Sequence, residues 1–128
     1  IKAIELNPQS NKAFCAMGIL KNNTNDLDES EKYFCRALDL NVDNVLAIKS
    51  LIEISYKTEN FNKAQKYLKL FLEIHPANIN MLFAMAGIQF KRGEIEDSLQ
   101  TLDDVLLLDP KHQHALDFQN SVRTVSVE

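Results

Sequence analysis

The feature that most constrains this chain is a short helix-ending segment that returns at a constant interval of about 34 residues. In each copy, apolar residues lead into a cluster of Asn, Asp or Pro: IELNPQS (4–10), LDLNVDN (38–44), LEIHPAN (72–78) and LLLDPKH (106–112). Proline ends a helix because it lacks the N–H that the helix needs and because it restricts the residue before it. We call this interval the repeat period. It predicts three full repeats, 11–44, 45–78 and 79–112, and two partial repeats, 1–10 and 113–128.

Each predicted repeat holds two blocks of apolar residues at spacings of 3, 4 and 7, the pattern of amphipathic helices. Polar turns separate the blocks: NNTND (22–26), KTEN (57–60) and KRGE (91–94). Asn25 and Gly93 hold equivalent places in these turns, and both residue types tolerate the left-handed backbone that ends a helix. Each repeat is therefore predicted to be an antiparallel hairpin of two helices, each of roughly 13 residues.

One copy of the helix-ending segment has Val42 in place of proline. Pro8, Pro76 and Pro110 hold the corresponding place in the other copies. Asn, Asp and Ser favour turns because their short polar side chains bond to nearby backbone groups. We therefore expect the neighbours of Val42 to supply the turn, namely Asn41, Asp43 and Asn44.

Particular residues in these repeats match the pattern of a known family. The first repeat has Phe14-x2-Met17-Gly18 and Ser30-x3-Phe34, the second has Ile48-x2-Leu51, Phe61, Ala64-x3-Leu68 and Pro76, and the third has Leu82-x2-Met85-Ala86, Gly93, Ile95, Leu102 and Pro110. This set resembles the tetratricopeptide repeat, which has the same length. The resemblance implies an all-α fold, an α-solenoid of stacked helical hairpins wound into a right-handed superhelix. It also implies that the first helix of each repeat lines a concave groove.

Two residues of the second repeat depart from the pattern of the others. Ile52 stands where Gly18 and Ala86 are small, and Phe71 stands where Ala37 is small. Ser55 is small near Phe71, so the volumes are expected to compensate and the packing to stay close to standard. Phe71 is predicted to lie in the core.

The exposed face of each first helix is the predicted partner-binding surface. Its candidate residues are Lys12, Ile19, Leu46, Lys49, Glu53, Tyr56, Lys57, Asn80, Phe83, Phe90 and Lys91. Cys15 is expected on the same face, and His114 and Asp117 would extend it. Apolar anchors with a basic rim suit a peptide or partner helix that carries apolar and acidic residues. For Phe83 and Phe90 an alternative stays open, namely that these rings pack against a neighbouring helix.

Repeats of this family that hold the C-terminal carboxylate of chaperones resemble one another in a clamp of lysine and asparagine. The matching places here are Cys15, Ile19, Ser50, Asn80 and Ala84. The clamp is missing, so a chaperone-tail adaptor is not expected.

The sequence holds no pattern that predicts catalysis, a metal site or a cofactor. His112 and His114 point in different directions on a helix, and no nearby cysteine completes a ligand set with them or with His75. Cys15 and Cys35 are expected to be unpaired, which favours a reducing cytoplasm. The chain is therefore predicted not to be an enzyme.

Charge and hydropathy exclude two further classes of partner. The net charge is −4 and the basic residues form no runs, which argues against a nucleic-acid-binding surface. No apolar run approaches the roughly 18 residues that a membrane span needs, and no signal peptide is recognisable. The prediction is a non-catalytic interaction module.

Two alternative functions are also compatible with the repeats. The array is read either as the substrate-recognition region of a larger enzyme, such as a glycosyltransferase, or as a scaffold that self-assembles through its repeat ends. The segment 1–8 matches the last third of a second helix, so at least one further repeat is expected before Ile1.

Overall fold

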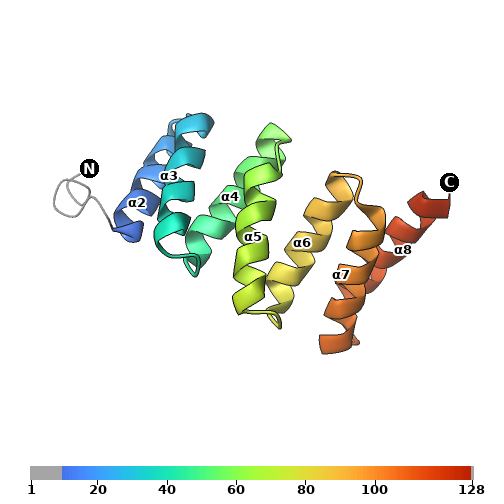
Figure 1. Ribbon diagram of the computed structural model, residues 1–128. Helices are drawn as coiled ribbons and strands as arrows, with labels where there is room; N and C mark the ends of the chain where they lie inside the picture. The colour runs from blue at the N-terminus through green and yellow to red at the C-terminus, as the bar shows by residue number, and fades with distance from the viewer. Residues whose placement is uncertain (1–9, 128) are drawn as a thin grey trace. The chain divides into compact units, whose positions relative to one another are not determined.

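The computed structural model describes residues 10–127, and in this range all regular structure is α-helical (Figure 1). The helices are α2 (Asn11–Asn23), α3 (Leu27–Leu40), α4 (Val45–Thr58), α5 (Asn62–Ile74), α6 (Ile79–Lys91), α7 (Ile95–Leu108) and α8 (Gln113–Val127). The predicted partial repeat at 1–10 lies almost wholly outside the described residues. The helix pairs α2–α3, α4–α5 and α6–α7 fall inside the three predicted full repeats.

The chain divides into two compact units, and the division falls within α5. The N-terminal unit runs to Tyr67 and contains α2, α3, α4 and the start of α5. The C-terminal unit begins at Leu68 and contains the rest of α5 with α6, α7 and α8.

Capping side chains fix the start of each first helix at the same place in every repeat. Ser10, Asn44, Asn78 and His112 follow one another at the repeat period. In each case the side chain accepts a hydrogen bond from the backbone N–H three residues later, at 3.3, 3.0, 3.1 and 3.0 Å respectively. These bonds satisfy N–H groups that a helix leaves without an internal partner. The expected turn around Val42 is confirmed, because Asn41 Oδ1 also accepts from the N–H of Asp43 at 3.1 Å.

A left-handed residue ends the first helix of each repeat. The backbone φ is +61° at Asn25, +57° at Glu59 and +79° at Gly93, and these places are again separated by the repeat period. The prediction for Asn25 and Gly93 is confirmed. Glu59 was not predicted, because a glutamate in this conformation is strained by its Cβ.

In the N-terminal unit, α2 and α3 approach each other closely at Gly18. A Cβ built on Gly18 would lie 2.7 Å from the ring of Phe34, so no larger residue fits without movement. The Ser30 hydroxyl, also buried, donates a 2.7 Å hydrogen bond to the carbonyl oxygen of Gly18. Phe34 and Leu38 of α3 and Ile48 of α4 are among the fully buried side chains of this unit.

In the C-terminal unit, α6, α7 and α8 share one apolar core. Its buried residues are Leu82, Ala86, Leu102, Val105, Ala115 and Val122. Ser98 repeats the arrangement of the first hairpin, because its hydroxyl donates to the carbonyl oxygen of Ala86 at 2.8 Å. Phe71 of α5 is buried, which confirms its predicted place in the core, and its ring lies 4.7 Å from that of His75.

The second repeat cannot form the corresponding serine bond. Ala64 stands at the place of Ser30 and Ser98, and it has no hydroxyl. The carbonyl oxygen of Ile52 instead accepts from Ser55 Oγ, on the same helix, at 2.5 Å. Ser55 is buried, and Ile52 is half-buried.

Among the described residues, no helix is both long enough and apolar enough to cross a membrane.

Candidate functional site

The N-terminal unit presents a mixed apolar and charged face on α4. Leu46 and Tyr56 are large side chains that remain 54% and 42% exposed, and Lys49, Glu53 and Lys57 are exposed between or beside them. These five residues recur at spacings of three, four and one, so they share one side of the helix. The Tyr56 ring packs edge-on against Phe61, with 5.1 Å between centroids, and burial of the hydroxyl raises the pKa of Tyr56.

The charged groups on this face are free to meet a partner. Within the described part of the chain, neither Lys49 nor Lys57 comes within 4.0 Å of a carboxylate, although Glu53 lies four residues from each. On α2, Lys12 is exposed and Ile19 is half-buried. The face of α4 therefore combines exposed apolar groups with two unpaired cations, the combination expected of a site for an apolar and acidic partner.

The C-terminal unit uses its two predicted aromatic anchors for packing. Phe83 and Phe90 are half-buried, and both meet Phe118 of α8 edge to face, at centroid distances of 6.0 and 5.4 Å. Phe83 also lies 5.3 Å from the ring of His112. Such edge-to-face pairs stabilise contacts between helices. The two rings thus pack on a neighbouring helix, as the alternative prediction held, and only part of each is exposed.

Asn80 and Lys91, the other predicted residues of α6, are exposed near its two ends. Sequence reasoning missed Phe118, which completes the aromatic cluster. The sequence does indicate this residue, since Phe118 is an aromatic residue in the last predicted segment and directly follows Asp117, which was predicted to extend the binding face.

One expectation about this face is wrong. Cys15 was expected on the binding face, but its side chain is only 4% exposed. Asn44, which caps α4 and bonds to Asn11 at 3.0 Å, lies near this thiol. Burial raises the pKa of Cys15, and the bond to Asn44 lowers it in part.

The second cysteine lies in a polar cluster between α3 and the start of α5. Lys63 pairs with Glu31 at 3.2 Å, and the Tyr67 hydroxyl donates to Asp39 at 2.6 Å. Cys35 sits between these contacts, and burial raises the pKa of its thiol to about 11, with Lys63 acting in the opposite direction. Burial and the bond to Asp39 also raise the pKa of Tyr67. Both cysteines are free thiols.

The described residues contain no group of three or more His, Cys, Asp or Glu side chains placed to hold a metal ion. His112 serves as a helix cap, and its ring lies 6.2 Å from that of His114.

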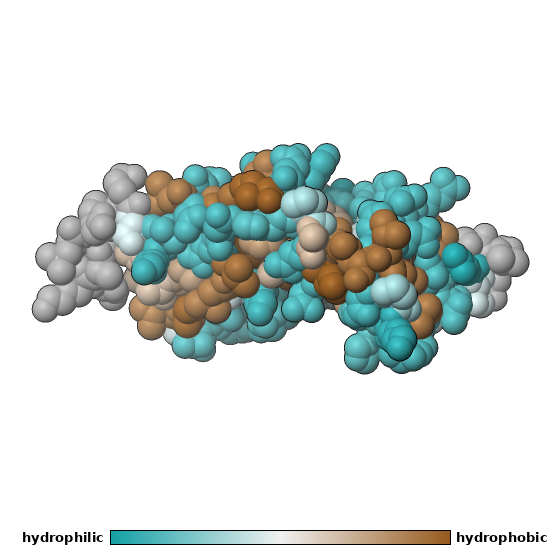
Figure 2. Space-filling model, turned by 90° about the horizontal axis from the view of Figure 1, so that it is seen from below, coloured by the Kyte–Doolittle hydropathy of each residue, from teal (hydrophilic) through white to brown (hydrophobic). Residues whose placement is uncertain are grey.

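The surface in Figure 2 carries hydrophobic residues in patches that hydrophilic residues separate. Two units built from helical hairpins, with local signals that return at one repeat period, define a helical-repeat protein of the all-α solenoid class. Models of the family described as tetratricopeptide repeat match residues 12–44 and 56–120. The chain belongs to the tetratricopeptide repeat family, a family of protein-interaction scaffolds.

Two curated proteins are similar in sequence. Anaphase-promoting complex subunit 3 of Dictyostelium discoideum is 25% identical over 114 residues, and the Sol locus transcriptional repressor of Clostridium acetobutylicum is 29% identical over 72 residues. The matches cover 88% and 56% of this chain, but only 12% and 23% of those proteins. The chain thus spans less than a quarter of the length of either relative.

Solved structures of tetratricopeptide repeat proteins share the fold. The first repeat domain of Spaghetti (RPAP3), solved with the HSP90 peptide SRMEEVD, has a TM-score of 0.74 at 13% identity and covers 94% of this chain and 95% of its own. MamA, as the RS-1 ArsTM double mutant, has a TM-score of 0.79 at 14% identity and covers 98% of this chain and 70% of its own. At such identities the likeness establishes the fold alone.

Proposed function

We propose that this chain is a non-catalytic interaction module that binds a peptide or partner helix of apolar and acidic character through the exposed sides of its first helices. The observation that carries the proposal is the face of α4. Two large apolar side chains, Leu46 and Tyr56, stay exposed there beside Lys49 and Lys57, which have no acidic partner among the described residues. A partner that covers this face removes apolar surface from water and supplies the missing carboxylates.

In the C-terminal unit, the first helix α6 offers a surface of a different kind. Phe83 and Phe90 are already held by Phe118, so they offer a pre-formed and rigid aromatic surface rather than mobile side chains. A rigid surface loses little conformational entropy on binding. Lys91 at the end of α6 adds a further exposed cation.

The structural relative solved with the HSP90 peptide is a precedent for peptide binding by this fold. The clamp of lysine and asparagine that the family resemblance links to chaperone tails is missing from this chain, whose matching places hold Cys15, Ile19, Ser50, Asn80 and Ala84. We therefore infer a different peptide, with internal acidic and apolar side chains.

A peptide library displayed on phage tests this proposal. Peptides selected on the intact chain should be enriched in Asp or Glu together with Leu, Phe or Met. Reversing the charge of Lys49, Lys57 and Lys91 to Glu should weaken the binding of the selected peptides at least tenfold by calorimetry, with little change in melting temperature.

A matched control carries the same change of charge elsewhere: Lys32→Glu, Lys69→Glu and Lys111→Glu, all at exposed lysines outside the first helices. Both variants have the same net charge, so a difference in their affinity for the peptides cannot come from net charge alone. The proposal fails if the two variants bind the selected peptides equally well.

The alternative of a substrate-recognition region in a larger enzyme gains no specific support from the site. Self-association has one observation in its favour, because Leu116 and Val125 of α8 remain partly exposed. Light scattering over a dilution series measures it, and a constant molar mass at the monomer value would exclude it.

A further inference from the structure

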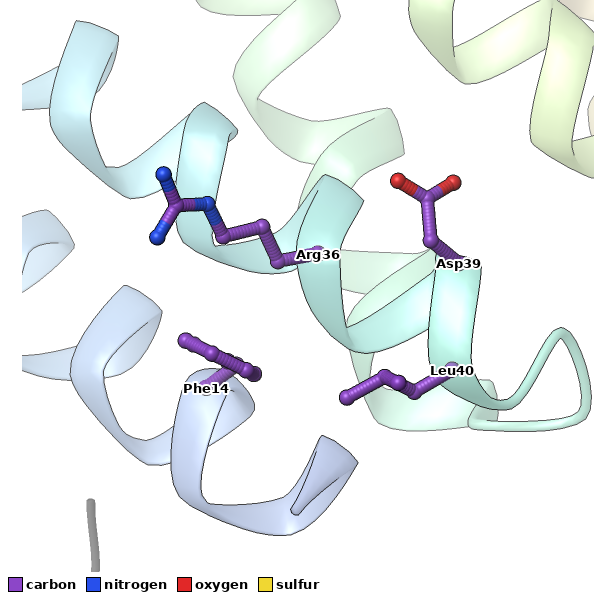
Figure 3. Close-up of a pocket in the computed structure, with 4 residues that line it drawn as sticks. All are labelled: Phe14, Arg36, Asp39 and Leu40. Atoms are coloured by element: carbon purple, nitrogen blue, oxygen red, sulfur yellow. The ribbon is translucent and has the colours of Figure 1, made fainter. Parts of the chain in front are cut away.

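We propose a second binding site, an open pocket between α2 and α3 that takes a peptide segment from another protein in which an apolar side chain lies next to a carboxylate. Its lining residues are Phe14 of α2 and Arg36, Asp39 and Leu40 of α3, and its volume is about 200 Å³ (Figure 3). None of them belongs to the face of α4, so this inference stands or falls independently of the proposed function.

Phe14 and Leu40 supply the apolar part of the pocket. Phe14 of α2 is half-buried. Leu40, at the end of α3, is 46% exposed. In Figure 3 the side chains of Phe14 and Leu40 extend toward each other from the two helices. A side chain placed between them would remove apolar surface from water on both sides.

The charge available at this pocket is positive. The Arg36 guanidinium carbon lies 5.8 Å from the centre of the Phe14 ring, and within the described residues Arg36 forms no ion pair. Asp39 is already engaged, because it accepts the 2.6 Å bond from Tyr67, and its carboxylate points away from Phe14. The pocket therefore offers a cation, held over an aromatic face, to an incoming anion.

The cation is particular to this repeat. Leu70 and Asp104 stand at the place of Arg36 in the second and third repeats. Arginine is suited to this task, because its planar guanidinium both stacks on an aromatic ring and pairs with a carboxylate through two N–H groups. A ligand with an apolar side chain alone would leave this group unused.

The size of the pocket limits the occupant to one aliphatic side chain and a neighbouring acidic residue. Adjacent residues in an extended chain are about 3.3–3.6 Å apart, which is short enough for the carboxylate to reach Arg36 while its neighbour enters between Phe14 and Leu40. The simplest probe with this chemistry is a capped pentapeptide, acetyl-Gly-Leu-Glu-Leu-Gly-amide.

Titration of this peptide into the intact chain, followed by NMR, is the direct test. Resonances of the Leu40 methyl groups and the Phe14 ring should shift in a saturable way. A peptide with Gln in place of Glu should bind at least threefold more weakly, and one with Ala in place of both leucines at least fivefold more weakly. The Arg36→Gln variant should bind the Glu peptide only as tightly as the intact chain binds the Gln peptide. Its affinity for the Gln peptide should be unchanged.

Matched controls separate the pocket from general surface effects. Lys32→Gln removes an exposed cation from α3, the helix that carries Arg36, and Leu20→Ala removes an exposed leucine from α2. Both should leave binding within twofold, as should the triple charge reversal on the first helices, whereas Leu40→Ala should weaken it.

Three results would overturn the inference. The first is an absence of shifts at Leu40 and Phe14. The second is equal affinity for the Glu and Gln peptides. The third is binding that appears only after residues 1–9 are removed, because the chain itself would then supply the occupant.

Discussion

The buried hydroxyl of Ser30 donates a 2.7 Å hydrogen bond to the carbonyl oxygen of Gly18, twelve residues earlier in the chain. Ser98 and Ala86 reproduce this relationship at 2.8 Å in the third repeat. In both hairpins a second-helix side chain thus holds the backbone of the first helix. A buried hydroxyl without this partner would lose its hydrogen bonds to water and gain none in return, so the bond favours one arrangement of each hairpin.

Removal of either hydroxyl should weaken the fold. Ser30→Ala and Ser98→Ala should each lower the free energy of unfolding by about 1 kcal/mol, the usual net value of a hydrogen bond, as measured by urea denaturation. Ser121→Ala is the control, since the Ser121 hydroxyl is exposed and bonds only within its own helix. Equal effects at all three serines would show that the bonds between helices do not contribute.

The close approach at Gly18 makes a second prediction. Gly18→Ala should destabilise the chain by about 1–3 kcal/mol, because the added Cβ would lie 2.7 Å from the Phe34 ring, although alanine favours a helix by about 1 kcal/mol. Phe34→Leu in the same chain should recover much of this loss, since Ala86 and Leu102 stand at these two places in the third repeat. The measurement is a double-mutant cycle of unfolding free energies. Strictly additive losses would contradict the proposed contact.

The left-handed turn positions predict opposite effects for two substitutions. Glu59→Gly should raise the free energy of unfolding by about 0.5–1 kcal/mol, because glycine adopts the φ of +57° without strain. Gly93→Ala should lower it by about 1 kcal/mol, although a Cβ there would meet no atom within 4 Å. Thermal and urea denaturation measure both changes. A gain from Gly93→Ala would mean that this turn does not hold its backbone angle in solution.

The thiols should be protected by burial. Only the thiolate reacts readily, and burial raises the pKa of Cys35 from its ordinary 9.0 to about 11 and also raises that of Cys15. Alkylation by iodoacetamide at about pH 8 should therefore be much slower in the folded chain than in denaturant. Mass spectrometry follows both sites, and equal rates in the two states would show that the thiols are accessible.

The raised pKa of Cys35 makes the free energy of unfolding depend on pH. The folded state holds the Cys35 proton more tightly than the unfolded state, so the associated stability is fully present below pH 9.0. It is lost as the pH rises through about 11. Cys35→Ala should flatten the fall in unfolding free energy over this window, whereas Ser121→Ala should not. An unchanged slope in Cys35→Ala would contradict the assignment.

Sequence reasoning succeeded where a rule acts over a few residues. The left-handed places at Asn25 and Gly93 and the turn around Val42 all depend on chemistry within one turn of chain. Phe71 was predicted to be buried because its helix has a clear apolar side. These signals located most helices of the described chain.

Prediction from the sequence failed where side chains from distant segments decide whether a residue is buried or exposed. The place of Cys15 on α2 predicted an exposed position, yet the thiol is buried and interacts with Asn44, which starts α4 two helices further along the chain. The contacts of Phe83 and Phe90 with Phe118 and the pocket beside Arg36 likewise depend on which helices meet. A periodic pattern gives the buried side of a helix but not the partner residue on its neighbour.

The four capping side chains have a consequence for how such a chain can change in length. Ser10, Asn44, Asn78 and His112 represent three different kinds of side chain, yet each one starts its own helix with a bond that spans only three residues. A segment as long as one repeat period therefore contains one of these capping side chains, wherever in the array the segment is inserted. Duplication or deletion of such a segment would leave each first helix with its capping side chain, so the array can lengthen or shorten by whole hairpins without loss of these bonds.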